Sequence, residues 1–430
     1  MLVTNLGKKG IIEKGPGFAS GLRDLRSHLN ISTISAGVIA TIFGCTGPAL
    51  IIINSAQAGN WTTAQTISWL FSIYFLGGVI SLILALYYKQ PINGAWSIPG
   101  AVLLATTLPL FSINEAAGGF VMAGLLVFIL GITGIMGKVM NWIPLPIVMA
   151  MIAGAMIRFG TGVVESVQKD LLIAGSALLA FLVAQRVGRN FPGTLVALIV
   201  GILVGFNQIN LNAMDISYAG PSFFIPEFNL STFLSISFPL ALLVIGAENA
   251  QAFGVLRAEG YRPPINAMTV ISGIGGIVAG FFGGHNANIA GPMTAICSSS
   301  EAGPNKEGRY AASVVNGVLF GSFGILAGFA VPFVEILPGS LINTVAGLAM
   351  IGVLVSAFEH GFSSHRFQIG AFAALVIAMS GLTLFSISAP FWSLVGGVIV
   401  SLFAEPNDFR FKEQIQSGSG LDPEPEKLAG

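Results

Sequence analysis

The stretch Ala95-Trp-Ser-Ile-Pro-Gly-Ala101 decides how this chain folds, because it joins an extended segment to the start of a short apolar helix. Proline favours the first turn of a helix, while the residue before it is pushed towards an extended conformation. A similar stretch, Ala287-Asn-Ile-Ala-Gly-Pro-Met293, follows 192 residues later. The pair predicts two short helices, each preceded by an extended lead-in, with ordinary proline-kinked helices as the alternative.

The composition of the chain places both stretches in a membrane. Of its 430 residues, 54% are hydrophobic and only 9% are charged, with 19 Lys and Arg balancing 19 Asp and Glu. A soluble domain carries about 25% charged residues, and so few could not cover a water-facing surface. We expect a polytopic protein in the lipid bilayer, and we exclude a soluble enzyme, a disordered protein and a nucleic-acid binder.

Fourteen apolar segments lie between Ile31 and Ala404, although the third, seventh, tenth and fourteenth are short. A membrane-spanning helix needs about 20 apolar residues. If the N-terminus is cytoplasmic, 17 of the 19 Lys and Arg residues fall on the cytoplasmic side and only Arg158 and Lys169 fall outside. This imbalance follows the positive-inside rule. It predicts an all-α polytopic membrane protein of 14 transmembrane segments with both termini in the cytoplasm.

Two further matches indicate an internal repeat. Ile152-Ala-Gly-Ala155 resembles Val345-Ala-Gly-Leu348 at an offset of 193, and Phe191-Pro192 begins the seventh segment as Ala389-Pro390 begins the fourteenth. Because seven is odd, a second set of seven segments must run opposite to the first. We predict a 7+7 inverted repeat, which is typical of secondary transporters whose sites lie near the membrane midplane where helices break.

One acidic residue lies deep inside an apolar segment, in Val244-Ile-Gly-Ala-Glu-Asn-Ala-Gln251. An ionised carboxylate at Glu248 costs about 2.5–3.5 kcal/mol on insertion scales, so the residue needs a reason to be there. A carboxyl group that exchanges a proton as the site opens to either side would couple transport to protons. The structural alternative is a permanently protonated Glu248 that bonds a neighbouring helix.

The two short helices would direct their N-terminal N–H groups, with about half a positive charge each, at the middle of the membrane. Such a place attracts an anion. The residues that we expect to bind it come from the two lead-ins and from the first and eighth segments: Trp96, Ser97, Ile98, Pro99, Gly100, Asn288, Ile289, Ala290, Gly291, Pro292, Thr46, Gly47, Asn249 and Gln251. Packing is the alternative for Trp96, and satisfying the broken backbone is the alternative for Asn288.

The remaining motifs carry less information. His285 follows the ninth segment, and its interpretation is open between an interfacial residue and a possible proton relay. Gly276/Gly280 and Gly317/Gly321 are small-residue pairs at a spacing that lets helices approach closely. The sequence contains no HExxH, GxxxxGK[ST] or GxSxG motif. We therefore expect no metal, no cofactor and no enzymatic activity.

Four stretches resemble the benzoate:proton symporters, the BenE family of bacterial inner-membrane carriers. They are Gly44-Cys-Thr-Gly-Pro48, Trp96-Ser-Ile-Pro-Gly100, Gly246-Ala-Glu-Asn-Ala-Gln251 and Gly283-Gly-His-Asn-Ala-Asn-Ile-Ala-Gly-Pro292. The resemblance covers about residues 20–405. It implies a secondary transporter that imports benzoate or a similar aromatic carboxylate with protons, by alternating access, across the bacterial inner membrane.

The resemblance also implies a core domain that moves against a gate domain. The expected halves of the core are residues 1–140 and 235–331, those of the gate are 141–206 and 332–404, and a disordered cytoplasmic tail is expected over 405–430. Related architectures are often homodimers, so a homodimer is a possible assembly.

In nucleobase carriers of similar architecture, a glutamate of the eighth segment meets substrate and proton, and it maps here onto Glu248. Those carriers have an acidic or polar residue just before an Asn-x-Gly in segment ten, whereas Ala287-Asn288-Ile-Ala-Gly291 has no acid and an altered spacing. This departure favours a carboxylate ligand, whose ring would pack against Phe43, Ile98 and Ile289. A nucleobase:proton symporter and a passive anion channel, which would not need Glu248, are the alternatives.

Overall fold

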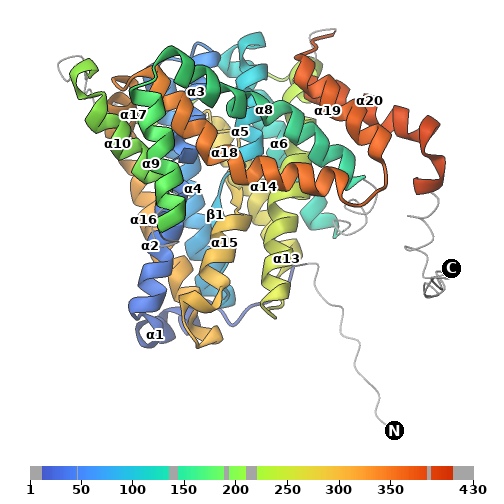
Figure 1. Ribbon diagram of the computed structural model, residues 1–430. Coiled ribbons are helices and arrows are strands. Elements are labelled where there is room, and N and C mark those ends of the chain that lie inside the picture. Colours follow the sequence, from blue (N-terminus) through green and yellow to red (C-terminus); the bar gives the residue numbers. More distant parts are fainter. Residues whose placement is uncertain are drawn as a thin grey trace, which may run out of the picture.

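A computed structural model describes residues 12–45, 47–134, 144–187, 193–209, 220–384 and 389–409. This part of the chain is a bundle of helices with two short paired strands inside it (Figure 1). Its outer surface is apolar: Leu172, Leu179 and Phe403 are 76%, 64% and 86% exposed. An apolar exterior over an apolar interior is what a bilayer-embedded bundle requires, because lipid replaces water around it.

The first half of the chain begins with an amphipathic helix, and longer apolar helices follow it. In order they are α1 (Phe18–His28), α2 (Ile31–Cys45), α3 (Gly47–Ala58), α4 (Thr63–Tyr88), α5 (Ile98–Thr107), the short 3-10 turn η1 (Leu108–Leu110), α6 (Ile113–Thr133), α8 (Leu145–Lys169), α9 (Ile173–Val187), α10 (Gly193–Val204) and the turn η2 (Phe206–Gln208). Capping boxes start α4 and α6, where the Thr62 and Ser112 side chains accept hydrogen bonds from backbone N–H groups three residues on.

The second half begins with one helical segment that contains two π-helical stretches. It runs through α11 (Leu230–Thr232), η4 (Phe233–Ser237), α12 (Phe238–Leu243), η5 (Val244–Asn249) and α13 (Ala250–Ala258). After it come α14 (Ile265–Phe281), α15 (Gly291–Ser298), the turns η6 (Ser300–Ala302) and η7 (Lys306–Gly308), α16 (Tyr310–Ile325), α17 (Ala327–Glu335), α18 (Gly339–Phe362), α19 (Gln368–Ser380) and α20 (Ala389–Ala404).

The two strands, β1 (Gly94–Ala95) and β2 (Asn288–Ile289), directly precede the short helices α5 and α15. They pair antiparallel, with Gly94 opposite Ile289, and β1 lies in the middle of the bundle (Figure 1). The extended lead-ins predicted from the two Pro/Gly stretches are therefore present. Their pairing brings the starts of two helices together that lie almost two hundred residues apart in the chain.

The helices form two packing groups. In one, α4 and α2 pack on α16 and α6 packs on α14; in the other, α8 packs on α18 and α19, α19 on α20, and α9 on α10. Close contact in the first group depends on glycine. A Cβ added to Gly78 of α4 would lie 2.5 Å from the Gly317 carbonyl oxygen and 2.6 Å from the Gly321 nitrogen. The small-residue pair of α16 thus faces a glycine of α4.

Six helices of the described residues are long and apolar enough to cross a membrane, or seven if the bent pair Lys306–Ile325 and Ala327–Glu335 is one span. Six shorter apolar helices have 10–17 residues, so the count of fourteen crossings stays a prediction. The expected border between the eleventh and twelfth segments, at 331/332, lies inside α17, and α18 begins only at Gly339. The bend between Ile325 and Ala327 lies in an apolar run that hydropathy cannot divide, whereas the start of α18 follows Glu335 and Pro338, which are a signal for it in the sequence.

The start of the expected disordered tail is packed against the bundle. Glu405 accepts a hydrogen bond from the Ile369 N–H at 2.8 Å, and Asp408 accepts one from the Phe367 N–H at 2.7 Å. Carboxylates at a helix N-terminus satisfy donors that the helix itself cannot. Order therefore extends past Glu405, contrary to the expectation, and residues 410–430 lie outside the described part of the chain.

Candidate functional site

The first turn of α5 presents one backbone donor that the helix does not use. Ser97 caps the helix, its side-chain oxygen accepting a hydrogen bond from the Gly100 N–H at 3.1 Å. Pro99 has no N–H, and the Ala101 N–H bonds to the Ser97 carbonyl oxygen. The N–H of Ile98 is therefore the donor left over at this end of the helix.

The first turn of α15 is built differently. Its capping position, Ala290, has no side-chain acceptor, and Pro292 follows Gly291 at the start of the helix. The turn is held from the opposite strand by Asn93, whose amide group donates to the Met293 carbonyl oxygen at 2.7 Å. The Gly291 N–H is again left free for a ligand or a side chain.

Polar side chains from both halves of the chain hold the lead-ins. The Asn286 amide oxygen accepts a hydrogen bond from the Ser97 N–H at 3.0 Å. The side-chain oxygens of Ser81 and Ser272 accept hydrogen bonds from the backbone of β1 and β2, respectively. Sequence reasoning missed these residues and Asn93. Asn93 and Asn286 are 193 positions apart, which is the offset of the repeat, so that offset could have found them.

Glu248 lies where the two helix N-termini meet. It belongs to the π-helical stretch η5, and only 6% of it is exposed. The backbone N–H groups of Ile98 and Gly291 approach its carboxyl group, as does the Ser97 side chain. π-Helical turns within α-helices are frequent at functional sites. One carboxyl group, two helix N-termini and a serine hydroxyl therefore converge at a single buried point.

Two cavities open from this point. The smaller comprises about 290 Å³ of space between atoms, including its open side. The larger encloses about 1330 Å³ including its open mouth, and it lies between α5, η5 and α13 on one side and α8 and α18 on the other. Four residues border both cavities: Phe43, Ile98, Glu248 and Pro292. The larger cavity thus lies between the two packing groups, with Glu248 at its inner end.

The smaller cavity has a largely apolar wall. Besides the four shared residues it is lined by Gly44, Pro48, Ala95, Trp96, Ala290, Met293 and Phe320. The contribution of Met293 and Phe320 was not foreseen: Met293 ends the second Pro/Gly stretch without having been assigned to the site, and Phe320 stands beside no motif in the sequence. Three aromatic rings and a thioether give flat apolar surfaces beside one carboxyl group, which suits a ligand that has a ring and a charged end.

The hydrogen bonds of His285 determine its tautomer. The Trp69 indole N–H donates to the His285 Nδ1 at 3.0 Å, so Nδ1 carries no proton. The other nitrogen, Nε2, lies 3.0 Å from the Ser97 carbonyl oxygen and must donate to it. His285 is fully buried, so this neutral form positions the lead-in of α5. The arrangement supports a positioning role, and it does not support the proton relay considered from sequence.

The other predicted residues divide between the cavities and the packing around them. Pro99 and Gln251 line the larger cavity, and a Cβ on Gly291 would overlap the Gln251 side chain. Asn249 turns away and accepts a hydrogen bond from the Ser272 hydroxyl at 3.2 Å.

Four of the remaining predicted residues lie away from both cavities or cannot be placed. Asn288 and Ile289 are fully buried in β2 and line neither cavity. Gly47 begins α3, and Thr46 lies outside the described residues. The apolar wall expected at Ile289 is thus supplied by Phe320 and Met293 instead. His360 of α18, which is not among the site residues predicted from the sequence, also lines the larger cavity.

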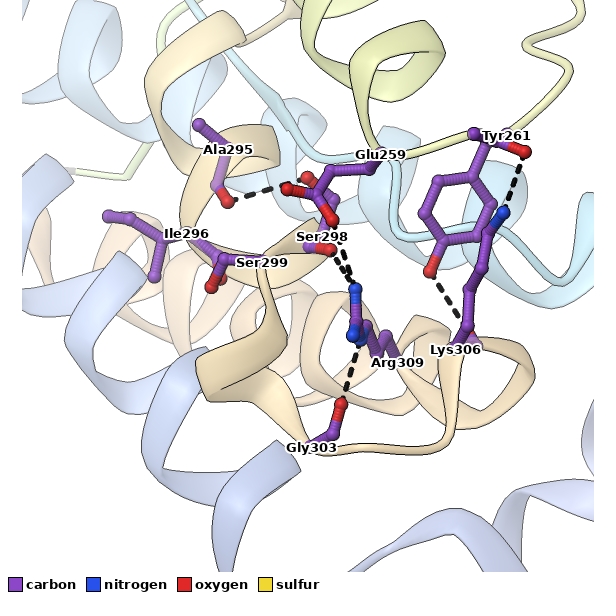
Figure 2. A network of polar contacts seen from close by, with 10 residues as sticks. Glu259, Tyr261, Ala295, Ile296, Ser298, Ser299, Gly303, Lys306 and Arg309 are labelled. Atoms are coloured by element: carbon purple, nitrogen blue, oxygen red, sulfur yellow. Dashed lines mark hydrogen bonds and ion pairs between the residues drawn. The ribbon is translucent and has the colours of Figure 1, made fainter.

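The far end of α15 is fixed by a polar network (Figure 2). The buried Arg309 donates to the Ser298 carbonyl oxygen at 2.6 Å and to the Gly303 carbonyl oxygen at 2.8 Å, and it pairs with Glu259 at 3.2 Å. A cation at a helix C-terminus balances the carbonyl groups that the helix leaves unpaired. The network ties the end of α13 to α15.

Beside this network, Lys306 forms hydrogen bonds with the Gly260–Tyr261 segment (Figure 2). The Lys306 ammonium donates to the Gly260 carbonyl oxygen at 2.6 Å, and the Tyr261 hydroxyl donates to the Lys306 carbonyl oxygen at 2.8 Å. Burial raises the pKa of Tyr261 to about 12. The hydroxyl therefore keeps its proton, and this hydrogen bond, at neutral pH.

An apolar bundle with two short helices that meet beside a buried carboxyl group defines a class of protein, the secondary membrane transporters. The family model described as "BenE: Benzoate membrane transport protein" matches residues 27–403. The chain therefore belongs to the BenE family of membrane transport proteins. Its relatives are transport proteins and not enzymes.

Two relatives cover almost the whole membrane region. The "Inner membrane protein YdcO" of Escherichia coli (strain K12) is 32% identical over 383 residues, which is 88% of this chain and 98% of that protein. The "Benzoate membrane transport protein" of Acinetobacter baylyi (strain ATCC 33305 / BD413 / ADP1) is 29% identical over 380 residues, which is 88% of this chain and 96% of that protein.

Solved structures share the fold at low sequence identity. The transmembrane domain of the cyanobacterial bicarbonate transporter BicA has a TM-score of 0.58 at 14% identity, covering 86% of this chain and 97% of that chain. SLC26A9 has a TM-score of 0.61 at 12% identity, covering 89% of this chain and 68% of that chain. These similarities support the fold only.

Proposed function

We propose that this protein imports benzoate or a similar aromatic carboxylate together with protons, by alternating access. The observation that carries the proposal is the meeting of the α5 and α15 N-termini at Glu248. Backbone N–H groups and two helix dipoles supply donors and positive potential, which a carboxylate needs and a neutral ring does not. The family's description and a relative named as a benzoate transport protein support the same substrate class.

The ring of the substrate would lie where the two cavities meet, against the aromatic wall of the smaller one. Phe43, Trp96 and Phe320 offer aromatic faces and edges there, and Met293 offers a polarizable thioether. Aromatic pairs prefer offset or edge-to-face contacts and contribute about 0.5–1.5 kcal/mol each beyond area burial. An aromatic carboxylate would thus satisfy both parts of the site, and a small inorganic anion would leave the apolar part unused.

Glu248 is the proposed proton carrier. Its carboxyl group lies at the inner end of the larger cavity, from which a proton can reach it. If one proton travels with one carboxylate, the loaded site has no added net charge, and its movement across the bilayer avoids the cost of moving an unpaired charge.

The state described here is proposed to face the cytoplasm of a bacterial cell. The mouth of the larger cavity is lined by the second half of α18, including Ser356 and His360. Arg366 follows α18, and Arg257 lies in the last turn of α13. The positive-inside rule assigns such basic ends to the cytoplasm, and the same rule places both termini there, in the inner membrane.

The two packing groups are proposed to be the moving bodies. The group of α2, α4, α6, α14 and α16 carries the site and would be the core, and the group of α8, α9, α10, α18, α19 and α20 would be the gate. Because the larger cavity lies between them, a displacement of one against the other would close it on this side and could open the site to the other.

Uptake of labelled benzoate into proteoliposomes tests the proposal. An inward proton gradient should drive accumulation above the level in protein-free liposomes, which is the necessary control because neutral benzoic acid crosses lipid unaided. Unlabelled benzoate should compete, and uracil should not. Competition by uracil would favour a nucleobase carrier, and downhill flux without accumulation would favour a passive facilitator.

A further inference from the structure

The donors around Glu248 are few, and they are the ones that a substrate carboxylate would need. Pro99 and Pro292 remove one N–H from each first turn, and Ser97 takes that of Gly100. Of the N–H groups that remain, those of Ile98 and Gly291 both approach the carboxyl group of Glu248. A second carboxylate at the same point would find these donors already engaged and a negative charge beside it.

Trp96 brings a further buried donor to this place. Its indole N–H approaches the hydroxyl group of Tyr74, and the residue is only 3% exposed. Trp96 lines the smaller cavity together with Glu248.

We propose that the ionised Glu248 side chain occupies the carboxylate position of the substrate site, so that its charge and the substrate carboxylate exclude each other. This inference rests on the proposed function. When Glu248 takes up one proton, the neutral acid releases the Ile98 and Gly291 N–H groups, and the substrate carboxylate accepts hydrogen bonds from them. The proton comes from solution and stays on Glu248 while the substrate is bound.

If the two carboxylates exclude each other, the proton and the substrate are coupled already at the binding step. A substrate anion cannot bind tightly while Glu248 is ionised, which suppresses transport of the anion without a proton. After release, Glu248 loses its proton and takes the vacated donors, so the empty carrier keeps its helix N-termini satisfied. Proton and substrate thus each strengthen the binding of the other by the same factor.

Two histidines are the other titratable groups near Glu248 that could affect the pH dependence of binding. His360 of α18 lines the larger cavity across from it, and His285 lies behind Ser97 with both ring nitrogens hydrogen-bonded. No other acidic, basic or histidine side chain borders either cavity within the ranges that the structure covers. His360 is therefore the group that a test of pH dependence must control for.

The test is the affinity of the purified protein for benzoate as a function of pH between about 6 and 9, measured by calorimetry. For the wild type we expect the affinity to fall by up to about tenfold per pH unit once Glu248 is ionised, since one proton is taken up per benzoate bound. Glu248→Gln should bind benzoate with a pH-independent affinity close to the wild type at low pH. His360→Asn should keep the wild-type pH dependence.

A second measurement uses the wild type alone, so that it does not depend on the folding of a variant. Benzoate added to the wild type in weakly buffered solution at the upper end of the range should take up close to one proton per site. Wild-type binding without proton uptake and without pH dependence would overturn the exclusion and leave benzoate transport standing. A folded Glu248→Gln that binds more weakly than wild type at every pH would also overturn it. Absence of benzoate binding to the wild type at every pH would instead sink the proposed function.

Discussion

The lead-in of α5 depends on a single histidine tautomer. His285 accepts from the Trp69 indole and donates to the Ser97 carbonyl oxygen, each at 3.0 Å. Ser97 in turn supplies the cap of α5 and touches Glu248. A residue that never reaches the substrate thus determines where the first-turn donors of α5 lie.

Replacing His285 with alanine should damage the site through its backbone. The indole N–H of Trp69 would lose its buried partner, at about 1–3 kcal/mol, and the carbonyl oxygen of Ser97 would keep only the Ala101 N–H. We expect a lower Tm and a raised KM for benzoate. His285→Gln, whose amide can both accept and donate, should recover much of both.

The pH profile separates positioning from proton relay at His285. Since the imidazole is neutral and held at both nitrogens, His285→Gln should leave the pH dependence of uptake where it is in the wild type. Loss of one limb of that profile in a variant with a near-normal Tm would show that His285 carries protons after all.

Gly44 limits the size of the ring cavity. A Cβ at this position would lie 2.7 Å from the Phe320 ring and 3.2 Å from the Met293 sulfur, both of which line the cavity. Gly44→Ala should raise the KM for benzoate several-fold while lowering the Tm only slightly. Gly254→Ala, at a position with open space around it, is the matched control and should change neither value.

Among individual residues, the sequence predicted those whose chemistry is unusual inside a membrane. Glu248 stood out because a carboxylate in an apolar run is costly, and the Pro/Gly pairs because they interrupt helices. Phe320, Met293 and Trp69 could not be found in the same way. They are ordinary apolar or aromatic residues in apolar segments, and only the packing of distant helices makes them part of a site.

The element that most needs support is α15, which has only eight residues. Its first turn is held by Asn93 and its last turn by Arg309 (Figure 2). Isolated helices of this length are unstable, so both ends must be fixed from outside. The donors of the site are thus positioned by groups at opposite ends of one short helix.

Arg309 should matter far more than the acidic residue with which it pairs. Arg309→Ala would leave the Ser298 and Gly303 carbonyl oxygens without their donor in a buried place, and we expect a loss of about 3 kcal/mol or more. Glu259 is partly exposed, so Glu259→Gln should cost at most about 1 kcal/mol. Thermal unfolding in detergent compares the two, and equal losses would contradict this assignment.

The sequence predicted the lead-ins and the short helices after them, because proline and glycine act locally. It did not locate the bend between Ile325 and Ala327 or the start of α18 at Gly339. The residues around the bend are uniformly apolar, whereas Glu335 and Pro338 before α18 are a signal from which its start could have been found. Where every residue suits lipid or a buried core equally well, hydropathy cannot mark the end of a helix, and helix packing decides.

At the scale of the whole molecule, the two packing groups and the cavity between them describe one side of a transport cycle. The larger cavity reaches Glu248 from the side of Ser356 and His360. The repeat predicted from matches near an offset of 193 is visible in paired residues on the two lead-ins. The proposed motion of a core against a gate followed only from the family resemblance, because it depends on which helices pack together, and no pattern of residues shows that.

The proposed orientation can be tested with single cysteines at the two ends of α18. With the free Cys45 and Cys297 replaced by alanine, Ser356→Cys should react with an impermeant maleimide in inside-out vesicles and not in intact cells. Gly339→Cys, at the exposed opposite end, should show the reverse. Labelling of Ser356→Cys from outside the cell would contradict a cavity open to the cytoplasm.

The central claim, one proton for each aromatic carboxylate, is tested most directly by driving uptake with two different forces. Benzoate accumulation in proteoliposomes would be measured with a pH gradient at zero membrane potential, and with a potassium diffusion potential at equal pH. Protein-free liposomes and Glu248→Gln would be run in parallel. We predict accumulation with the pH gradient, none with the potential alone, and none above background in Glu248→Gln. Accumulation that follows the potential, or that survives in Glu248→Gln, would contradict the account.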